Sequence, residues 1–260
     1  MRFLAIGDVV GDVGCRMIEN HLSSLIRFYG VDQVVVNGEN AFKGRGLNRK
    51  TVELLFASGA NVITSGNHIW DHREIFDFID KDDRILRPAN YPAETPGLGW
   101  NKFWAGSTGI PYVVINLLGR VFLSEVDCPF HAADRILESI SKDVKIILVD
   151  FHAEATSEKF ALAHYLKSRV SAIFGTHTHV QTSDEQILAG HTGYITDLGM
   201  TGPHDSILGV DSEAVIYKFK TQLPVRFKSA EGAGRLDGIF LEIDEKTGKT
   251  NTIERIQVFE

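Results

Sequence analysis

The chain has 260 residues, of which 43% are hydrophobic and 23% charged. This composition is typical of a globular protein and excludes a disordered or collagen-like chain. The 34 acidic residues outnumber the 27 basic ones, and the net charge of −7 argues against a dedicated, stable DNA- or RNA-binding protein. A small phosphorylated substrate remains compatible with this charge, because bound metal ions reverse the sign of a local pocket.

Cysteine content and hydropathy indicate a cytoplasmic protein without membrane association. Two cysteines, Cys15 and Cys128, are too few for a disulfide scaffold. The apolar run at the N-terminus is too short for a signal peptide. The most apolar long stretch, residues 103–119, is interrupted by Pro111 and Asn116 and does not fit a membrane span.

Short apolar runs alternate with helical patterns along much of the chain. In chain order, the sequence predicts a strand at 3–6, a helix from Cys15 to Tyr29 that ends at Gly30, a strand at 34–36, a helix capped by Asn48, a strand at 61–64, and later a strand at 145–149, a helix at 157–167 and a strand at 172–174. Strands and helices that alternate at this spacing predict βαβ units and a layered α/β fold.

Two further regions have strand character without intervening helices. They are residues 100–123 and the C-terminal third, with expected strands at 217–219, 239–243 and 253–259. These strands could form a second, more antiparallel sheet or the outer edges of the first. No internal repeat or linker is evident, so we expect residues 1–260 to form one domain.

Side chains with a carboxylate, amide or imidazole group follow five of the expected strands. The strand ends carry, in order, Asp8, then Glu39-Asn40, then Asn67-His68, then His152, and finally His177 and His179. Each residue alone is explained by a turn, a cap or an ordinary histidine. Together they predict a site, because the carboxyl ends of strands in an open α/β sheet line one crevice.

The chemistry of these side chains indicates a metal centre. Carboxylate, amide and imidazole groups suit manganese, iron, zinc or cobalt better than a thiolate-bound metal. The groups at these strand ends outnumber the four ligands of a structural zinc site. They suit two metal ions roughly 3.5–4 Å apart that share a bridging carboxylate.

The order of these motifs resembles the calcineurin-like metallophosphoesterase superfamily. That superfamily usually opens with Asp-x-His, whereas this chain has Val10 at the histidine position and Gly38-Glu39-Asn40 in the second motif. These departures resemble the bacterial YmdB-like branch, which starts with a near-identical Gly-Asp-Val-Val-Gly and carries a late segment like residues 197–203 here. The resemblance extends from Arg2 to about Gly209.

The resemblance implies two β-sheets flanked by helices (an α/β/β/α sandwich) and a dinuclear phosphodiesterase. The implied substrates are cyclic nucleotides, 2′,3′-cyclic ones first and 3′,5′-cyclic ones as a further candidate, attacked at phosphorus by a metal-bound hydroxide. Two ions per chain are implied, iron or manganese, with zinc as the alternative. By position, the first ion would be held by Asp8, Asn40 and His179, the second by Asn67, His152 and His177, and both by the bridging Glu39.

Three more residues are candidates around this centre. His68 follows a ligand without being one in the family pattern, so we expect it to protonate the leaving group, with orientation of Asn67 or the hydroxide as the alternative. Arg45 and His204 are candidate substrate contacts, and each is also explained as a loop surface residue.

Other functions fit less well. A phosphomonoesterase or nucleotidase would use the same ligands, and substrate walls rather than ligands separate the two activities. An amidohydrolase places His-x-His early in the chain, whereas here the pair is late. A regulatory protein that acts through RNA metabolism stays open if it acts by catalysis, and a homo-oligomer is a reasonable expectation.

Overall fold

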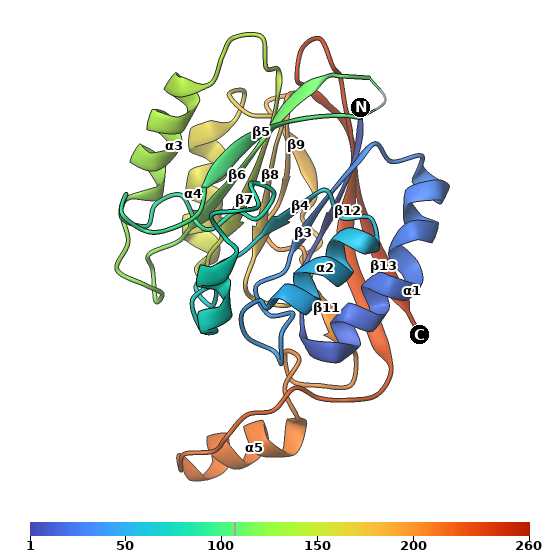
Figure 1. The fold of residues 1–260 in the computed structure, drawn as a ribbon, viewed down its shortest axis with the longest axis vertical. Coiled ribbons are helices and arrows are strands. Elements are labelled where there is room, and N and C mark those ends of the chain that lie inside the picture. The colour runs from blue at the N-terminus through green and yellow to red at the C-terminus, as the bar shows by residue number, and fades with distance from the viewer. Residues whose placement is uncertain (107) are drawn as a thin grey trace.

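The computed structural model describes residues 1–106 and 108–260. Two β-sheets form its centre (Figure 1). The seven-stranded sheet has the order β2-β11-β12-β1-β3-β4, with β13 also paired to β12. Its strands are β1 (Arg2–Ile6), β2 (Asp8–Val9), β3 (Gln33–Asn37), β4 (Val62–Thr64), β11 (Met200–Pro203), β12 (Gly234–Ile243) and β13 (Thr250–Phe259).

The six-stranded sheet has the order β5-β6-β7-β8-β10-β9. Strands β6, β7, β8 and β10 run parallel, while β5 and β9 are antiparallel edges. The strands are β5 (Trp100–Trp104), β6 (Pro111–Leu118), β7 (Ile146–His152), β8 (Ala172–Thr176), β9 (Gln186–Leu188) and β10 (Thr192–Ile195).

Helices cover the outer faces of both sheets (Figure 1). One core cluster joins α1 (Gly11–Tyr29) and α2 (Arg49–Ala57) to the first sheet, and a second joins α3 (Pro129–Ser139) and α4 (Thr156–Leu166) to the other. A third cluster lies between the sheets, where Phe3 and Val35 of the first share a core with Tyr112 and Leu148 of the second. The expected α/β/β/α layering is therefore confirmed.

Most expected elements form where the apolar pattern places them. The first helix ends at Gly30, and Asn48 caps α2 by accepting a hydrogen bond from the Thr51 backbone NH at 2.9 Å. The antiparallel segments divide between the sheets: β5 and β6 belong to the second sheet, while β12 and β13 belong to the first.

The strand expected at 217–219 is wrong. These residues lie in α5 (Ser212–Thr221), which projects from the body of the molecule (Figure 1). Asp211 caps this helix, its carboxylate accepting from the Ala214 NH at 3.0 Å. An apolar-polar-apolar triplet fits either a strand or a helix, and the upstream cap decides for the helix.

The remaining helical turn is the 3-10 segment η1 (Arg73–Asp77). Across residues 1–106 and 108–260, no helix has the length and apolar character to cross a membrane.

Candidate metal centre

The sheets bring the predicted ligands together at one edge. The crevice at this edge lies where parallel strands end. They are β1, β3 and β4 of one sheet and β7 and β8 of the other. His152 is the last residue of β7, and Glu39 is the second residue after β3. His177 and His179 follow β8 with φ angles of 101° and 63°. Such angles cost about 1–3 kcal/mol each and concentrate at functional sites.

Hydrogen bonds fix which nitrogen of the buried His152 ring faces the crevice. The Thr176 hydroxyl lies 2.7 Å from an oxygen of Asp150 and 2.9 Å from His152 Nδ1. The hydroxyl has one proton, which it donates to Asp150, so it accepts from His152 Nδ1–H. His152 Nε2 is thereby the nitrogen left for a metal ion, as is usual when the other nitrogen has a hydrogen-bond partner.

Three groups converge on His152 Nε2. Glu39 Oε1 and His177 Nδ1 each lie 3.0 Å away, and Asn67 Oδ1 lies 3.1 Å away. Glu39, His152 and His177 offer ligand atoms within 4.8 Å of one another. Glycine at position 66 permits this approach, because a Cβ there would lie 2.3 Å from Glu39 Oε2 and from the His152 ring.

A second group lies beside the first. Asp8 Oδ1 is 3.7 Å from His152 Nδ1 and 3.9 Å from His179 Nε2. His179 Nδ1 lies 2.9 Å from the carbonyl of Leu208 and donates to it, which leaves Nε2 as the ligand nitrogen. Asn40 donates its amide NH to the Gly44 carbonyl at 3.0 Å, which leaves its oxygen for a cation.

Unsatisfied oxygens at this place fit metal ions. Asp8 Oδ1, Glu39 Oε1 and Asn40 Oδ1 are buried, and none has a hydrogen-bond partner. Buried polar atoms are normally paired, so three orphaned acceptors together require an explanation. All three belong to predicted ligands, and divalent metal ions bind carboxylate, amide and imidazole groups of this kind. The residues present therefore fit a metal centre.

The charges of the site attract a cation. Burial raises the pKa of Asp8 to about 6, although His179 and His152 oppose the shift. Burial also acts to raise the pKa of Glu39, but the charge of His152, whose Nε2 lies 3.0 Å from Glu39 Oε1, prevails and lowers it to about 2. Burial acts to lower the pKa of His152, but Glu39 and Asp8 prevail and raise it to about 9. The carboxylates thus stabilise positive charge where a metal ion would sit.

His177 is held as a neutral ligand. Burial and the charge of His152 lower the pKa of His177 to about 3. Its Nε2 lies 3.0 Å from Glu154 Oε2, so the ring proton is on Nε2 and Nδ1 is free to bind a metal ion.

A buried ion pair supports the loop that carries His177 and His179. Lys159 Nζ of α4 lies 2.6 Å from Asp197 Oδ2, and both side chains are 1% exposed. Asp197 also accepts from the backbone NH groups of Thr178 at 3.1 Å and Gly199 at 2.9 Å. Asp197 therefore fixes the position of this loop.

An open cavity of about 530 Å³ adjoins the site, with Asn40, His68 and His179 in its lining. Arg45 also lines it. His68 Nδ1 lies 3.0 Å from Asp71 Oδ2, and Arg45 Nε lies 3.8 Å from the same oxygen. The expected acid and the expected substrate contact thus meet at one carboxylate.

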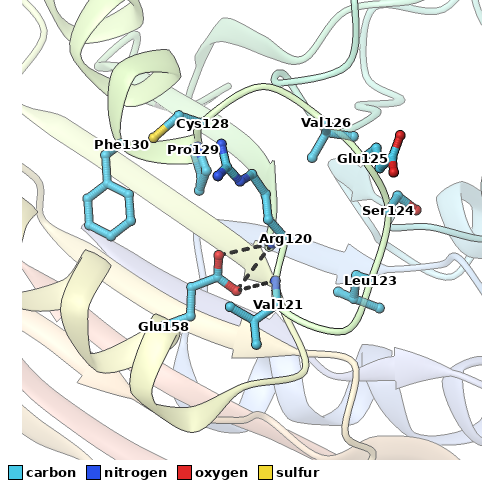
Figure 2. Close-up of a pocket in the computed structure, with 10 residues that line it drawn as sticks. All are labelled: Arg120, Val121, Leu123, Ser124, Glu125, Val126, Cys128, Pro129, Phe130 and Glu158. Carbon is cyan, nitrogen blue, oxygen red and sulfur yellow. Dashed lines mark hydrogen bonds between the residues drawn. The ribbon is translucent and has the colours of Figure 1, made fainter.

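His204 lies elsewhere. Its exposed ring packs edge-on against Phe259, with centroids 5.1 Å apart, and it is not part of the cavity lining. Figure 2 shows another hollow, of about 520 Å³, beside the 120–128 loop. There Glu158 accepts from the backbone NH groups of Arg120 and Val121, and no predicted ligand takes part.

Sequence reasoning missed the residues that hold the ligands. Asn37, Thr64 and Thr176 all donate to the buried Asp150, at 3.0, 2.5 and 2.7 Å. Asp150 stands two residues before His152, but its polar partners lie on other strands. A buried acid inside an apolar strand was the available signal, because such a group needs partners.

Comparisons with known proteins show the family of the chain. The profile of the YmdB-like protein family matches residues 4–256. A 2′,3′-cyclic-nucleotide 2′-phosphodiesterase of Bacillus subtilis (strain 168) is 50% identical over 258 residues, covering 99% of this chain and 97% of the relative.

Solved structures show the same fold. A hypothetical protein from Thermus thermophilus has a TM-score of 0.94 at 41% identity, covering 100% of both chains. A novel phosphatase from Mycoplasma pneumoniae has a TM-score of 0.93 at 33% identity, covering 100% of this chain and 93% of the other. The 5′-nucleotidase of Candida albicans SC5314 shares the fold alone, with a TM-score of 0.57 at 12% identity over 99% of this chain and 51% of the other. By profile, sequence and structure, the chain belongs to the YmdB-like protein family.

Proposed function

We propose that this protein is a dinuclear-metal phosphodiesterase that hydrolyses 2′,3′-cyclic nucleotides. The observation that carries the proposal is the group of three orphaned buried oxygens beside three histidines at one edge of two sheets. The name of the relative from Bacillus subtilis supplies the substrate class. 3′,5′-cyclic nucleotides are a second candidate substrate, because the same ligands serve any phosphodiester.

The seven predicted ligands divide into two sets. Asp8, Asn40 and His179 would hold one ion, Asn67, His152 and His177 the other, and Glu39 both. Bound metal ions supply charge stabilisation of phosphate oxygens and a nucleophilic water at neutral pH. Iron or manganese suits these ligands, and zinc is the alternative.

His68 is suited to deliver the proton that the leaving oxygen needs. It lines the cavity beside the ligands, and its backbone NH donates to Glu39 Oε2 at 3.1 Å, which fixes its place in the site. Asp71 accepts from Nδ1 and orients the ring, so that Nε2 is the nitrogen available to the substrate. Arg45, beside the same Asp71, is placed to contact a phosphate oxygen.

The test is hydrolysis of 2′,3′-cyclic AMP by purified protein after chelation and after addition of Mn²⁺ or Fe²⁺. Turnover should disappear on chelation and return with metal, and Glu39→Gln should remove it by about a thousandfold or more, because the bridging position needs an anion with two oxygens. The Glu125→Gln variant is the matched control and should keep wild-type turnover, since Glu125 lies on the 120–128 loop at the other hollow.

Other results would change the assignment. Turnover of nucleoside monophosphates but not of cyclic nucleotides would make the protein a phosphomonoesterase. Fewer than two metal ions per chain by mass spectrometry would contradict the dinuclear site.

A further inference from the structure

The cavity beside the metal centre has a charge opposite to that of the whole protein. Its lining contains four basic side chains, Lys43, Arg45, Arg226 and Lys228, and no aspartate or glutamate. The chain as a whole has a net charge of −7. This part of the surface therefore favours anions, although the protein as a whole repels them.

Three of these four cations have no carboxylate partner among the residues that the structure describes. Among the described residues, no carboxylate lies within 4.0 Å of Lys43, Arg226 or Lys228. Arg45 has Asp71 at 3.8 Å. Unpaired basic groups that share a cavity repel one another, so they are best stabilised by an external anion.

The two loops that carry these residues are held against each other. Lys43 and Arg45 follow the ligand Asn40, and Arg226 and Lys228 lie on the segment that returns from α5. A Cβ on Gly44 would lie 2.5 Å from the hydroxyl of Ser229, so glycine permits the contact between the loops. The cavity, which we call the cleft, is therefore built by packing of two segments that are distant in the sequence.

A cyclic mononucleotide does not use so much positive charge. A 2′,3′-cyclic phosphate carries one negative charge, and in the proposed function the metal ions face it. Arg45 has this phosphate to contact in the proposed function, but Lys43, Arg226 and Lys228 have no anion to bind in such a substrate. Arginine and lysine at a concave surface are typical phosphate contacts. Phe227, 43% exposed, adds an aromatic ring to the same lining, on which a base can stack.

We infer that Lys43, Arg226 and Lys228 of this cleft bind a second phosphate of the substrate. The preferred substrate is then a nucleotide that carries a phosphate besides the cyclic one. Two sources share this chemistry: a 5′-phosphate on the same nucleoside, and the internucleotide phosphate of a short oligonucleotide that ends in a 2′,3′-cyclic phosphate. This inference rests on the proposed function.

The experiment compares kcat/KM for three substrates of the Mn²⁺-loaded protein. They are adenosine 2′,3′-cyclic phosphate, its 5′-phosphorylated form, and the dinucleotide ApA with a terminal 2′,3′-cyclic phosphate. We expect about a tenfold preference for at least one substrate with a second phosphate, since charge-assisted contacts are the strong ones. The substrate that gains identifies the source of the phosphate. KM should rise more steeply with salt for that substrate, because salt screens the additional charged contact.

The variants test whether the cleft causes the preference. The double variant Arg226→Ala/Lys228→Ala should reduce the selectivity ratio to about twofold or less. The control Lys220→Ala/Lys246→Ala removes the same charge from exposed positions outside the cavity lining and should keep the wild-type ratio. Equal kcat/KM for all three substrates, or a ratio that survives the double variant, would overturn the inference.

A binding measurement separates failure of this inference from failure of the proposed function. If no substrate is hydrolysed with any metal, the proposed function fails. Calorimetry on the same protein then compares adenosine 3′-phosphate with adenosine 3′,5′-bisphosphate and with ApA carrying a 3′-phosphate. Tighter binding of a ligand with the added phosphate that the double variant loses would support the cleft, and equal binding of all three would contradict it.

Discussion

The buried charged residues near the metal site and the exposed charged residues of the cavity lining differ in whether they have partners. We call the buried residues Asp150 and Asp197 the floor, and the exposed residues Lys43, Arg226 and Lys228 the rim. In the floor, Asp150 and Asp197 are 0% and 1% exposed, and each is surrounded by hydrogen-bond donors of the protein. At the rim, Lys43, Arg226 and Lys228 are exposed and have no carboxylate within the distance of an ion pair in the described part of the chain. The floor fixes geometry, and the rim leaves charge available for a ligand.

This difference decides what a substitution does. A buried charge that loses its partner remains desolvated, so removing one member of a pair is strongly destabilising. An exposed charge is stabilised by water, and its loss changes stability little. Variants of the floor should therefore alter folding or metal binding, whereas variants of the rim should alter substrate choice.

Lys159→Met should have the largest effect on stability. It leaves Asp197 without its cation at a site that is 1% exposed. Breaking such a pair costs about 3–5 kcal/mol. Urea denaturation measures the free energy of unfolding. Lys102→Met, which removes a more exposed partner of Asp143, is the control and should cost less than about 1 kcal/mol. Equal losses in the two variants would contradict the distinction between floor and surface.

His68→Asn should lower turnover by about a hundredfold, because it removes the side chain that we propose as the general acid. Metal content by mass spectrometry should stay at the wild-type level, and loss of metal would contradict the acid role. A diester with a p-nitrophenolate leaving group needs little protonation. The variant should therefore lose several times less turnover on that substrate. An orienting residue would affect both substrates equally. His72→Asn is the control, since His72 packs edge-on against Phe42.

Thr176→Val should weaken metal binding by about 10–100-fold, the usual effect of losing a group that orients a metal ligand. The change keeps the shape but removes the acceptor of the His152 Nδ1–H bond. Titration of the metal-free protein with Mn²⁺ measures the affinity. Thr64→Val removes another hydroxyl that donates to Asp150 without touching His152, and it should leave metal affinity within about threefold. If both variants lose affinity alike, Thr176 acts through Asp150 and not through the imidazole.

The candidate metal ligands could be proposed from sequence where the pattern that indicates them is local. A candidate metal ligand one or two residues beyond an apolar run can be proposed from a single motif, as with Asp8 and Glu39. Their supporting partners could not be found in this way. Asn37, Thr64 and Thr176 contact Asp150 from positions 26 to 113 residues away in the sequence.

The rim was less predictable. Arg45 was identified because it follows a ligand motif, whereas Arg226 and Lys228 reach the same cavity only because the segment after α5 folds back. The expected strand at 217–219 obscured that return, since a strand there would have continued a sheet and not formed a projecting helix. His204 was proposed because it is close to a motif, and the structure places its ring against Phe259, outside the cavity lining.

Glu260→Gln should have the smallest effect and a pH dependence that identifies it. Glu260 accepts from Arg16 at 2.7 Å and from the Gly234 NH at 3.0 Å, and these bonds lower its pKa from 4.5 to about 2. A carboxyl group with a lowered pKa in the fold stabilises the protein above pH 4.5, and this contribution is lost as the pH falls toward 2. The pair is partly exposed, so the wild type should exceed the variant by only about 0.5 kcal/mol at pH 7. Urea denaturation at pH 7 and near pH 3 should show this difference shrinking on acidification. A difference that grows instead would mean that the ion pair does not hold β13 to α1.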